Sequence, residues 1–167
     1  AVYIEDRQKL EKFLNIDMKE NVLSWIDNEI GVVQLHSKES GNVGEFAVVI
    51  RHNDRDNATK NLDFIKKQVK KKTPVKFKDI NYKGYNVSFL SIKGFFKVMF
   101  GRAFNKIDKP YYTVMEDYVV FSNQPSTLGK IISAYQEGKT LRNKPEFEQY
   151  LDRFDTKSTL FAYINPK

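Results

Sequence analysis

The absence of cysteine is the feature that most limits what this sequence of 167 residues can fold into. Without cysteine the chain has no disulfide scaffold, no thiolate metal site and no thiol nucleophile. An apolar core must therefore hold the fold together. The sequence supplies the material for it, because 41% of the residues are hydrophobic and 14% are aromatic. A chain of this length can bury roughly 70% of the surface that it exposes when unfolded, so we expect one domain over residues 1–167.

Hydrophobic periodicity and turn residues predict alternating helices and strands. The first helix, residues 4–16, has Leu10, Phe13 and Leu14 on one face, and Asp17 caps a second short helix with Glu20 three residues later. The remaining helices are predicted over residues 56–72, 125–137 and 143–154, with Asn143 as the cap of the last. The strands are predicted over residues 29–36, 45–51, 75–82, 85–92, 111–115, 118–122 and 159–164, with a loop at 37–44.

Two parts of this pattern resemble each other. Residues 46–65 and 118–132 both contain a strand, a polar turn and a helix, and each follows another strand. A repeated ββα unit would build an antiparallel sheet with helices gathered on one face. We therefore predict an α+β fold with a mostly antiparallel sheet and helices packed on one face.

The positive charge is concentrated in one segment. Residues 60–83 hold nine lysines and two aspartates, which accounts for the whole net charge of +7. Nucleic-acid binding is not predicted, because lysine greatly outnumbers arginine and the rest of the chain is neutral. No apolar run approaches the length of a membrane span. The chain starts at Ala1, and we interpret it as an excised piece of a longer protein.

The sequence is similar to a family of uncharacterised bacterial domains, domain-of-unknown-function family 3352, seen in envelope-associated proteins. The similarity rests on ordered apolar and glycine positions: Trp25-x-x-Asn28-Glu29-Ile30-Gly31, Tyr82-Lys83-Gly84-Tyr85, Tyr111, Asp117-Tyr118-Val119-Val120-Phe121-Ser122, Gly138-Lys139-Thr140-Leu141, Phe147 and Phe161-Ala162-Tyr163-Ile164. The resemblance implies an extracytoplasmic location, a membrane-anchored parent protein and no known enzymatic activity. It implies no catalytic residues.

The segment Gly94–Phe104 is the first candidate site. Basic residues interleave with a dense aromatic and apolar run, and glycines near both ends allow the segment to stand away from the sheet. Such a segment suits an anionic membrane interface, an amphipathic ligand or a partner surface. Its spacing fits equally a short helix that closes the core. The candidate residues are Phe95, Phe96, Lys97, Met99, Phe100, Arg102 and Phe104.

Two further candidates carry positive charge. Lys66, Lys67, Lys70 and Lys71 form either a solvated helix face or a patch for an anionic surface. Arg51, His52 and Arg55 lie at the start of a helix, where an anion is favoured. The alternative there is that Asn53 or Asp54 caps the helix.

No catalytic constellation is recognisable. His36 and His52 are too few for a metal site, and neither a nucleophile elbow nor a phosphate-binding glycine loop is present. We expect no enzymatic activity, no cofactor and no metal. The expected function is binding or scaffolding within a larger envelope protein, with a protein partner or a membrane surface. The alternative is a soluble carrier that holds a lipid or another amphiphile between sheet and helices.

Overall fold

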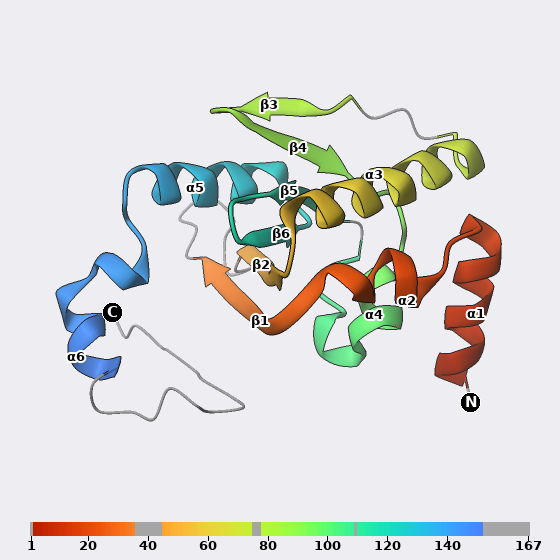
Figure 1. The fold of residues 1–167 in the computed structure, drawn as a ribbon, viewed down its shortest axis with the longest axis horizontal. Helices are drawn as coiled ribbons and strands as arrows, with labels where there is room; N and C mark the ends of the chain where they lie inside the picture. The colour runs from red at the N-terminus through yellow and green to blue at the C-terminus, as the bar shows by residue number, and fades with distance from the viewer. Residues whose placement is uncertain (1, 36–44, 75–77, 109, 152–167) are drawn as a thin grey trace. The chain divides into compact units, whose positions relative to one another are not determined.

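The structure is a computed structural model that describes residues 2–35, 45–74, 78–108 and 110–151 (Figure 1). The chain divides into two compact units, residues 1–132 and 133–167. Its strands are β1 (Ile26–Leu35), β2 (Glu45–His52), β3 (Ile80–Tyr82), β4 (Tyr85–Phe89), β5 (Tyr111–Val114) and β6 (Tyr118–Ser122). Its α-helices are α1 (Val2–Leu14), α2 (Met18–Asn21), α3 (Arg55–Lys72), α4 (Phe95–Phe100), α5 (Pro125–Gln136) and α6 (Pro145–Leu151). Three single turns of 3₁₀ helix are η1 (Leu23–Trp25), η2 (Arg102–Phe104) and η3 (Leu141–Asn143).

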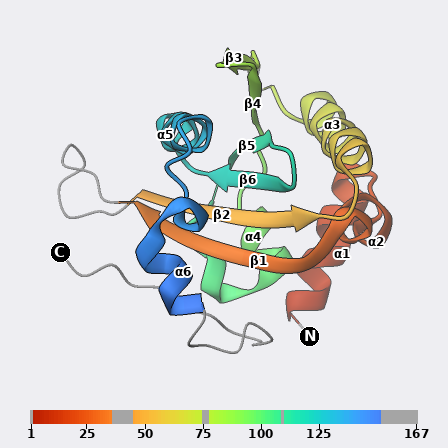
Figure 2. The same cartoon turned by 60° about the vertical axis from the view of Figure 1, so that its left-hand side comes forward.

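The first unit is built on one antiparallel sheet with strand order β1-β2-β6-β5-β4-β3. Two of its inner strands, β2 and β6, pair with each other, and Val49 lies opposite Val120. Figure 2 shows the β3–β4 hairpin extending away from these central strands. The predicted α+β fold with a mostly antiparallel sheet is confirmed.

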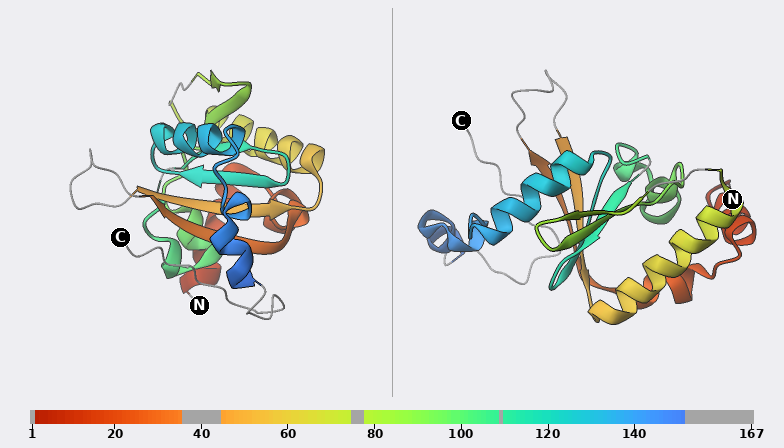
Figure 3. Two further views of the ribbon diagram at one scale, coloured as in Figure 1. Left: turned by 90° about the vertical axis from the view of Figure 1, so that its left-hand side faces the viewer. Right: turned by 90° about the horizontal axis from the view of Figure 1, so that it is seen from above.

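Helices cover both faces of the sheet, not one face as predicted. Val48 and Ile50 of β2 pack in one core with α1, α2, α3 and α4, whereas Ala47 of β2 packs in a second core with Leu128 and Ile132 of α5. Successive residues of a strand point to opposite faces, so the two cores lie on opposite sides of the sheet. The right-hand view of Figure 3 shows α3 and α5 on either side of the strands.

The reason is that the central strands are apolar on both faces. Phe46–Ile50 and Val119–Phe121 are continuous apolar runs, which are typical of strands buried on both sides. Helices on one face would leave Ala47, Val120 and their neighbours in water. The paired strands therefore repeat as predicted, but α3 and α5 follow them onto opposite faces.

Several local predictions are confirmed. Asp17 Oδ1 accepts a hydrogen bond from the Glu20 amide at 2.8 Å and caps α2, although the side chain that returns to the Asp17 amide is Asn21. Asp54 caps α3, with Oδ1 2.6 Å from the Asn57 amide. The β3–β4 turn is Lys83-Gly84, and both residues have positive φ, which suits a tight hairpin.

Other local predictions are wrong or lie outside the described residues. Of the face predicted for the first helix, Leu14 is in the core and Leu10 packs against it, but Phe13 is exposed. Asn143 does not cap α6, because it ends η3 and its side chain donates to the carbonyl of Gly138. His36, the loop 37–44, residues 75–77, the end of the helix predicted to 154 and the strand predicted at 159–164 lie outside the described residues.

Candidate functional site

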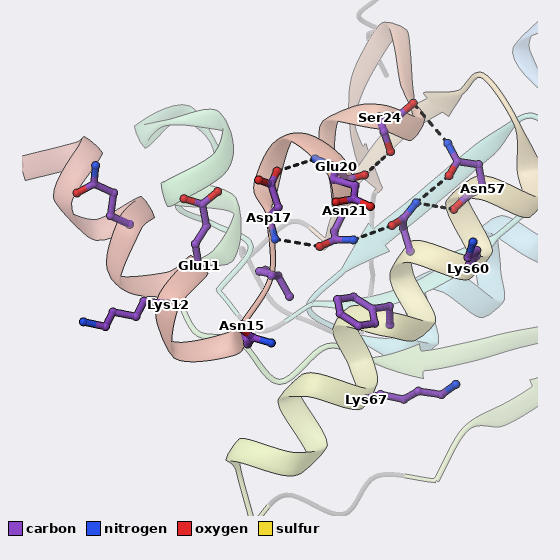
Figure 4. Close-up of a pocket in the computed structure, with 14 residues that line it drawn as sticks. Glu11, Lys12, Asn15, Asp17, Glu20, Asn21, Ser24, Asn57, Lys60 and Lys67 are labelled. Carbon is purple, nitrogen blue, oxygen red and sulfur yellow. Dashed lines mark hydrogen bonds between the residues drawn. The ribbon is translucent and has the colours of Figure 1, made fainter.

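An open groove lies between α1, α2 and α3 in the first unit and has a volume of about 1070 Å³ (Figure 4). The chain forms it locally. Asn15 ends α1 with a positive φ of 53°, a conformation that asparagine tolerates better than most residues, and α2 follows directly. Leu14, Met18 and Trp25 anchor this reversal in the core. The groove is lined by Gln8, Glu11, Lys12, Asn15, Ile16, Asp17, Glu20, Asn21, Ser24, Asn57, Lys60, Asn61, Phe64 and Lys67.

A row of side-chain amides joins the two walls. Asn21 Nδ2 donates to Asn61 Oδ1 at 3.0 Å, and Asn61 Nδ2 donates to the Asn57 side-chain oxygen at 2.8 Å. Asn57 in turn reaches the carbonyl of Ser24 at 3.5 Å. These bonds hold α2 against α3 and fix the shape of this part of the groove.

Two of the carboxylates that line the groove already have partners. Glu11 Oε1 accepts from the Met18 amide at 2.8 Å and lies 3.5 Å from Arg7 Nη2. Asp17 is occupied as the cap of α2. Glu20 lies near Ser24, toward the other end of the groove from Lys12 and Lys67 (Figure 4).

Three lysines that line the groove have no ion-pair partner among the described residues: Lys12 from α1, and Lys60 and Lys67 from α3. All three are exposed. Phe64 lies between Lys60 and Lys67 along α3, four residues after the first and three before the second, so the three side chains share one face of the helix. The ring of Phe64 is 37% exposed. The groove thus presents three lysines beside an apolar surface, and the Glu20 carboxylate also belongs to its lining.

This arrangement can attract an anionic group and contact an apolar one. Lysines attract anions as flexible point charges, and an exposed aromatic ring beside them can pack against an apolar group of the same ligand. Within the described part of the chain, no group of three or more histidine or carboxylate side chains is placed to hold a metal ion.

Lys66, a predicted member of the basic patch, turns away from that surface. Its Nζ lies 2.9 Å from Asp79 Oδ2, 3.1 Å from Asp63 Oδ1 and 3.2 Å from Ser88 Oγ, so its three N–H groups all have acceptors. This cluster borders a second cavity of about 250 Å³, between α3 and the β3–β4 hairpin. Lys66 therefore ties the helix to the hairpin and is not available to an anionic surface.

The ionisation of this cluster follows from its surroundings. Burial lowers the pKa of Lys66, but Tyr112 and the carboxylates of Asp79 and Asp63 outweigh it and hold the pKa above its usual value. Burial raises the pKa of Tyr112 to about 12. At neutral pH Lys66 is therefore charged and Tyr112 is neutral, so Lys66 cannot serve as a base for the neighbouring Ser88.

The other predicted basic residues remain on the surface. Lys67, Lys70 and Lys71 are exposed on α3, and Lys67 also lines the groove. The structure brings Lys67 together with Lys12 and Lys60, which were not predicted as site residues. Charge alone did not single out Lys60, and Lys12 lies far away in sequence.

The predicted aromatic segment is mainly core. Phe95 is 2% exposed and Phe96 is 0% exposed, and the ring of Phe96 contacts Phe121 edge to face with centroids 4.9 Å apart. Met99, Phe100 and Phe104 are half-buried and pack against the same core. Lys97 and Arg102 point to solvent. This burial favours the interpretation of a short helix that closes the core.

The predicted anion site does not assemble. Arg51 Nε and Nη1 lie 3.6 Å from carboxylates of Asp27 and Glu29 on β1. His52 is buried, and its Nε2 lies 3.2 Å from the carbonyl of Met115. Arg55 is exposed at the start of α3, where Asp54 provides the cap. The alternative interpretation, a capped helix start, is the one that the structure bears out.

No helix in the described ranges combines the length and the apolar character needed to cross a membrane. No curated protein and no solved structure matches the chain. One family matches, described as "Protein of unknown function (DUF3352)", over residues 46–167. This match covers β2 to the C-terminal residue and so includes α3 and two of the three groove lysines. Because it spans well over half of the sequence, the chain belongs to this family of proteins of unknown function.

Proposed function

We propose that the first unit is a non-catalytic binding domain that holds an acidic segment of a partner protein in the groove between α1, α2 and α3. One observation carries the proposal: Lys12, Lys60 and Lys67 line one groove without ion-pair partners among the described residues, while Glu11 and Asp17 of the same groove are engaged.

The shape of the site supports a protein segment over a membrane surface. The lysines surround a recess of about 1070 Å³, in which a chain segment can lie, whereas a bilayer meets a convex face. The row of Asn21, Asn57 and Asn61 places amide groups across the junction of α2 and α3, and amides suit the backbone of a bound peptide. Phe64 offers a ring to an apolar side chain of that segment.

The test uses a fluorescently labelled oligo-glutamate peptide, with an oligo-lysine peptide as the control of opposite charge. We expect the full chain to bind oligo-glutamate at low salt and to release it as salt rises, because exposed charges are screened over about 10 Å at 0.1 M. The double variant Lys60→Glu/Lys67→Glu should weaken binding at least about tenfold, measured by fluorescence anisotropy.

The matched control is Lys93→Glu/Lys97→Glu, which changes the net charge equally but alters exposed lysines outside the groove. Binding that falls equally in both double variants would show an effect of net charge only and would contradict the proposal. Vesicles of phosphatidylglycerol form a further arm. Binding to vesicles that survives the groove variant, with no peptide binding, would favour a membrane surface instead.

The carrier alternative has no support from the cavities. Both the groove and the cavity beside Lys66 are lined largely by polar side chains, with Ile16 in the first and Val114 in the second among the few apolar ones. We further propose that the domain acts outside the cytoplasm as part of an envelope protein. The resemblance set out above supports this location, and fractionation of cells that express the parent protein tests it.

A further inference from the structure

The face of α3 that lines the groove presents its charges and its apolar surface in a fixed order. The residues of this face follow the three- and four-residue spacing of one helix stripe: Asn57, Lys60, Asn61, Phe64 and Lys67. At a rise of about 1.5 Å per residue, Phe64 lies about 6 Å along the helix axis from Lys60 and about 4.5 Å from Lys67. The stripe therefore offers a cation, an aromatic ring and a second cation in succession.

Phe64 is the exposed apolar side chain of this groove. The lining includes two apolar residues, Ile16 and Phe64. Ile16 is only 8% exposed and belongs to the core, whereas Phe64 is 37% exposed. An aromatic ring in contact with water gains free energy when an apolar side chain of a ligand covers it. The positive charge of the lysines is therefore only part of what the groove can recognise.

The Glu20 carboxylate limits where the acidic side chains of a ligand can lie. Glu20 lines the groove toward the end away from Lys12 and Lys67 (Figure 4). A continuous acidic run along the groove would bring a like charge to Glu20, which costs free energy. Acidic side chains are favoured beside the lysines instead, with an uncharged residue over Phe64.

We propose that the groove selects an extended segment in which an apolar residue stands between two acidic ones at alternate positions, in the order acidic-x-apolar-x-acidic. This inference rests on the function proposed above and names the sequence pattern that the site takes. Every second side chain of an extended chain points to the same side, at a spacing of about 6.6 Å. The apolar side chain then covers Phe64, and the two acidic ones reach Lys60 and Lys67, whose flexible stems make up the difference in spacing.

The other residues of the groove fit this arrangement. Lys12 of α1 lies toward the same end of the groove as Lys67 and adds a second cation for the acidic residue there (Figure 4). An extended segment also leaves its backbone N–H and C=O groups free for polar side chains of the groove such as Asn57, whereas a helical segment uses these groups internally.

Three fluorescently labelled peptides of equal charge test the pattern by anisotropy with the full chain at low salt. Glu-Ser-Leu-Ser-Glu should bind about fivefold more tightly than Glu-Ser-Ser-Ser-Glu, because its leucine is covered by the ring of Phe64. Glu-Leu-Ser-Ser-Glu has the composition of the first peptide, but its leucine points away from the ring. It should therefore bind no more tightly than the peptide without leucine.

Two variants of the chain complete the experiment. Phe64→Gln should bind Glu-Ser-Leu-Ser-Glu and Glu-Ser-Ser-Ser-Glu equally. The matched control is Phe13→Gln, which removes another exposed ring, at 53% exposure, from α1 outside the groove lining. This variant should keep the preference of the wild type. Circular dichroism of both variants establishes that they fold.

The outcomes separate this inference from the function on which it rests. Oligo-glutamate binding by the wild type, with no preference among the three peptides, would overturn the pattern and leave the acidic-segment function standing. A preference for Glu-Ser-Leu-Ser-Glu that persists in Phe64→Gln would also overturn the pattern. If none of the acidic peptides binds, oligo-glutamate included, both proposals fail.

Discussion

Replacing Lys66 with methionine tests the assignment of this lysine to the structure instead of to the basic surface. The side chain of Lys66 is 13% exposed, and Nζ donates to Asp63, Asp79 and Ser88. Methionine keeps most of the buried stem but removes all three bonds. Asp63 and Asp79 are more than a third exposed, so each ion pair contributes about 0.5–1 kcal/mol after solvent screening. The buried Ser88 hydroxyl loses a donor, which costs about 1 kcal/mol.

The expected loss is therefore about 2–3 kcal/mol in the free energy of unfolding. In a domain of this size, that loss lowers Tm by roughly 4–12 °C. Urea denaturation followed by circular dichroism measures it as a lower midpoint with an unchanged slope. The matched control is Lys67→Met on the next position of α3, where the lysine is exposed and without an ion-pair partner in the described part of the chain. Its effect should stay within about 0.5 kcal/mol.

Equal losses in the two variants would refute the reasoning, since they would show that Lys66 is no more engaged than its exposed neighbour. A double-mutant cycle that combines Lys66→Met with Asp79→Asn measures the coupling free energy between the two side chains. The coupling between Lys66 and Asp79 should exceed about 0.5 kcal/mol, because the two atoms lie 2.9 Å apart.

Four further outcomes are expected. The pKa of Lys66 lies above its ordinary 10.5, and the pKa of Tyr112 rises from 10.0 to about 12, so the folded state retains protons that the unfolded chain releases. The free energy of unfolding should therefore be constant near neutral pH and fall above about pH 10, which urea midpoints measured at several pH values will show. Asp54→Ala should cost about 1 kcal/mol and Asp54→Asn much less, because asparagine also caps a helix. Gly138→Ala should lower the free energy of unfolding by about 1 kcal/mol, because φ at this position is +68°. It should also speed amide exchange at the end of α5, because the Gly138 and Lys139 amides hydrogen-bond to carbonyls of the last turn. Phe96→Ala should cost about 3–5 kcal/mol in denaturation, and a loss below about 1 kcal/mol would contradict its place in the core.

The elements of the first unit were predictable because their signals are local. Asp54 before α3 and Thr73-Pro74 after it mark the two ends of one amphipathic helix, and the paired strands were recognisable from their branched and aromatic residues. The matching runs around Val49 and Val120 even predicted two similar strand pairs, and the structure places these runs opposite each other in the centre of the sheet.

The face on which each helix packs was predicted wrongly, although a signal for the right answer was present. A strand covered on one face alternates apolar and polar residues, and neither Phe46–Ile50 nor Val119–Phe121 does so. These continuous runs require cover on both sides. Applying that rule to the sequence would have placed α3 and α5 on opposite faces.

The groove was missed because its parts come from distant segments. Lys12 and Lys67 meet only after Leu14 and Met18 enter the core and bring α1 and α2 beside α3. Lys66 and Lys67 are adjacent in sequence, yet one turns inward to Asp79 and the other outward. Asp79 approaches Lys66 only when the β3–β4 hairpin folds back, and no local pattern contains that information.

The central pairing of β2 with β6 bears on how the chain acquires its fold during synthesis. Each residue of β2 finds its partner in β6 about 70 residues later. At ribosomal rates of roughly 5–20 residues per second, β2 waits about 4–14 seconds for that partner. Until then the face of Val48 and Ile50 has α1, α2 and α3 as cover, whereas the face of Ala47 still lacks α5. We therefore expect the half of the sheet that emerges first to expose apolar surface until Tyr118–Ser122 and α5 arrive.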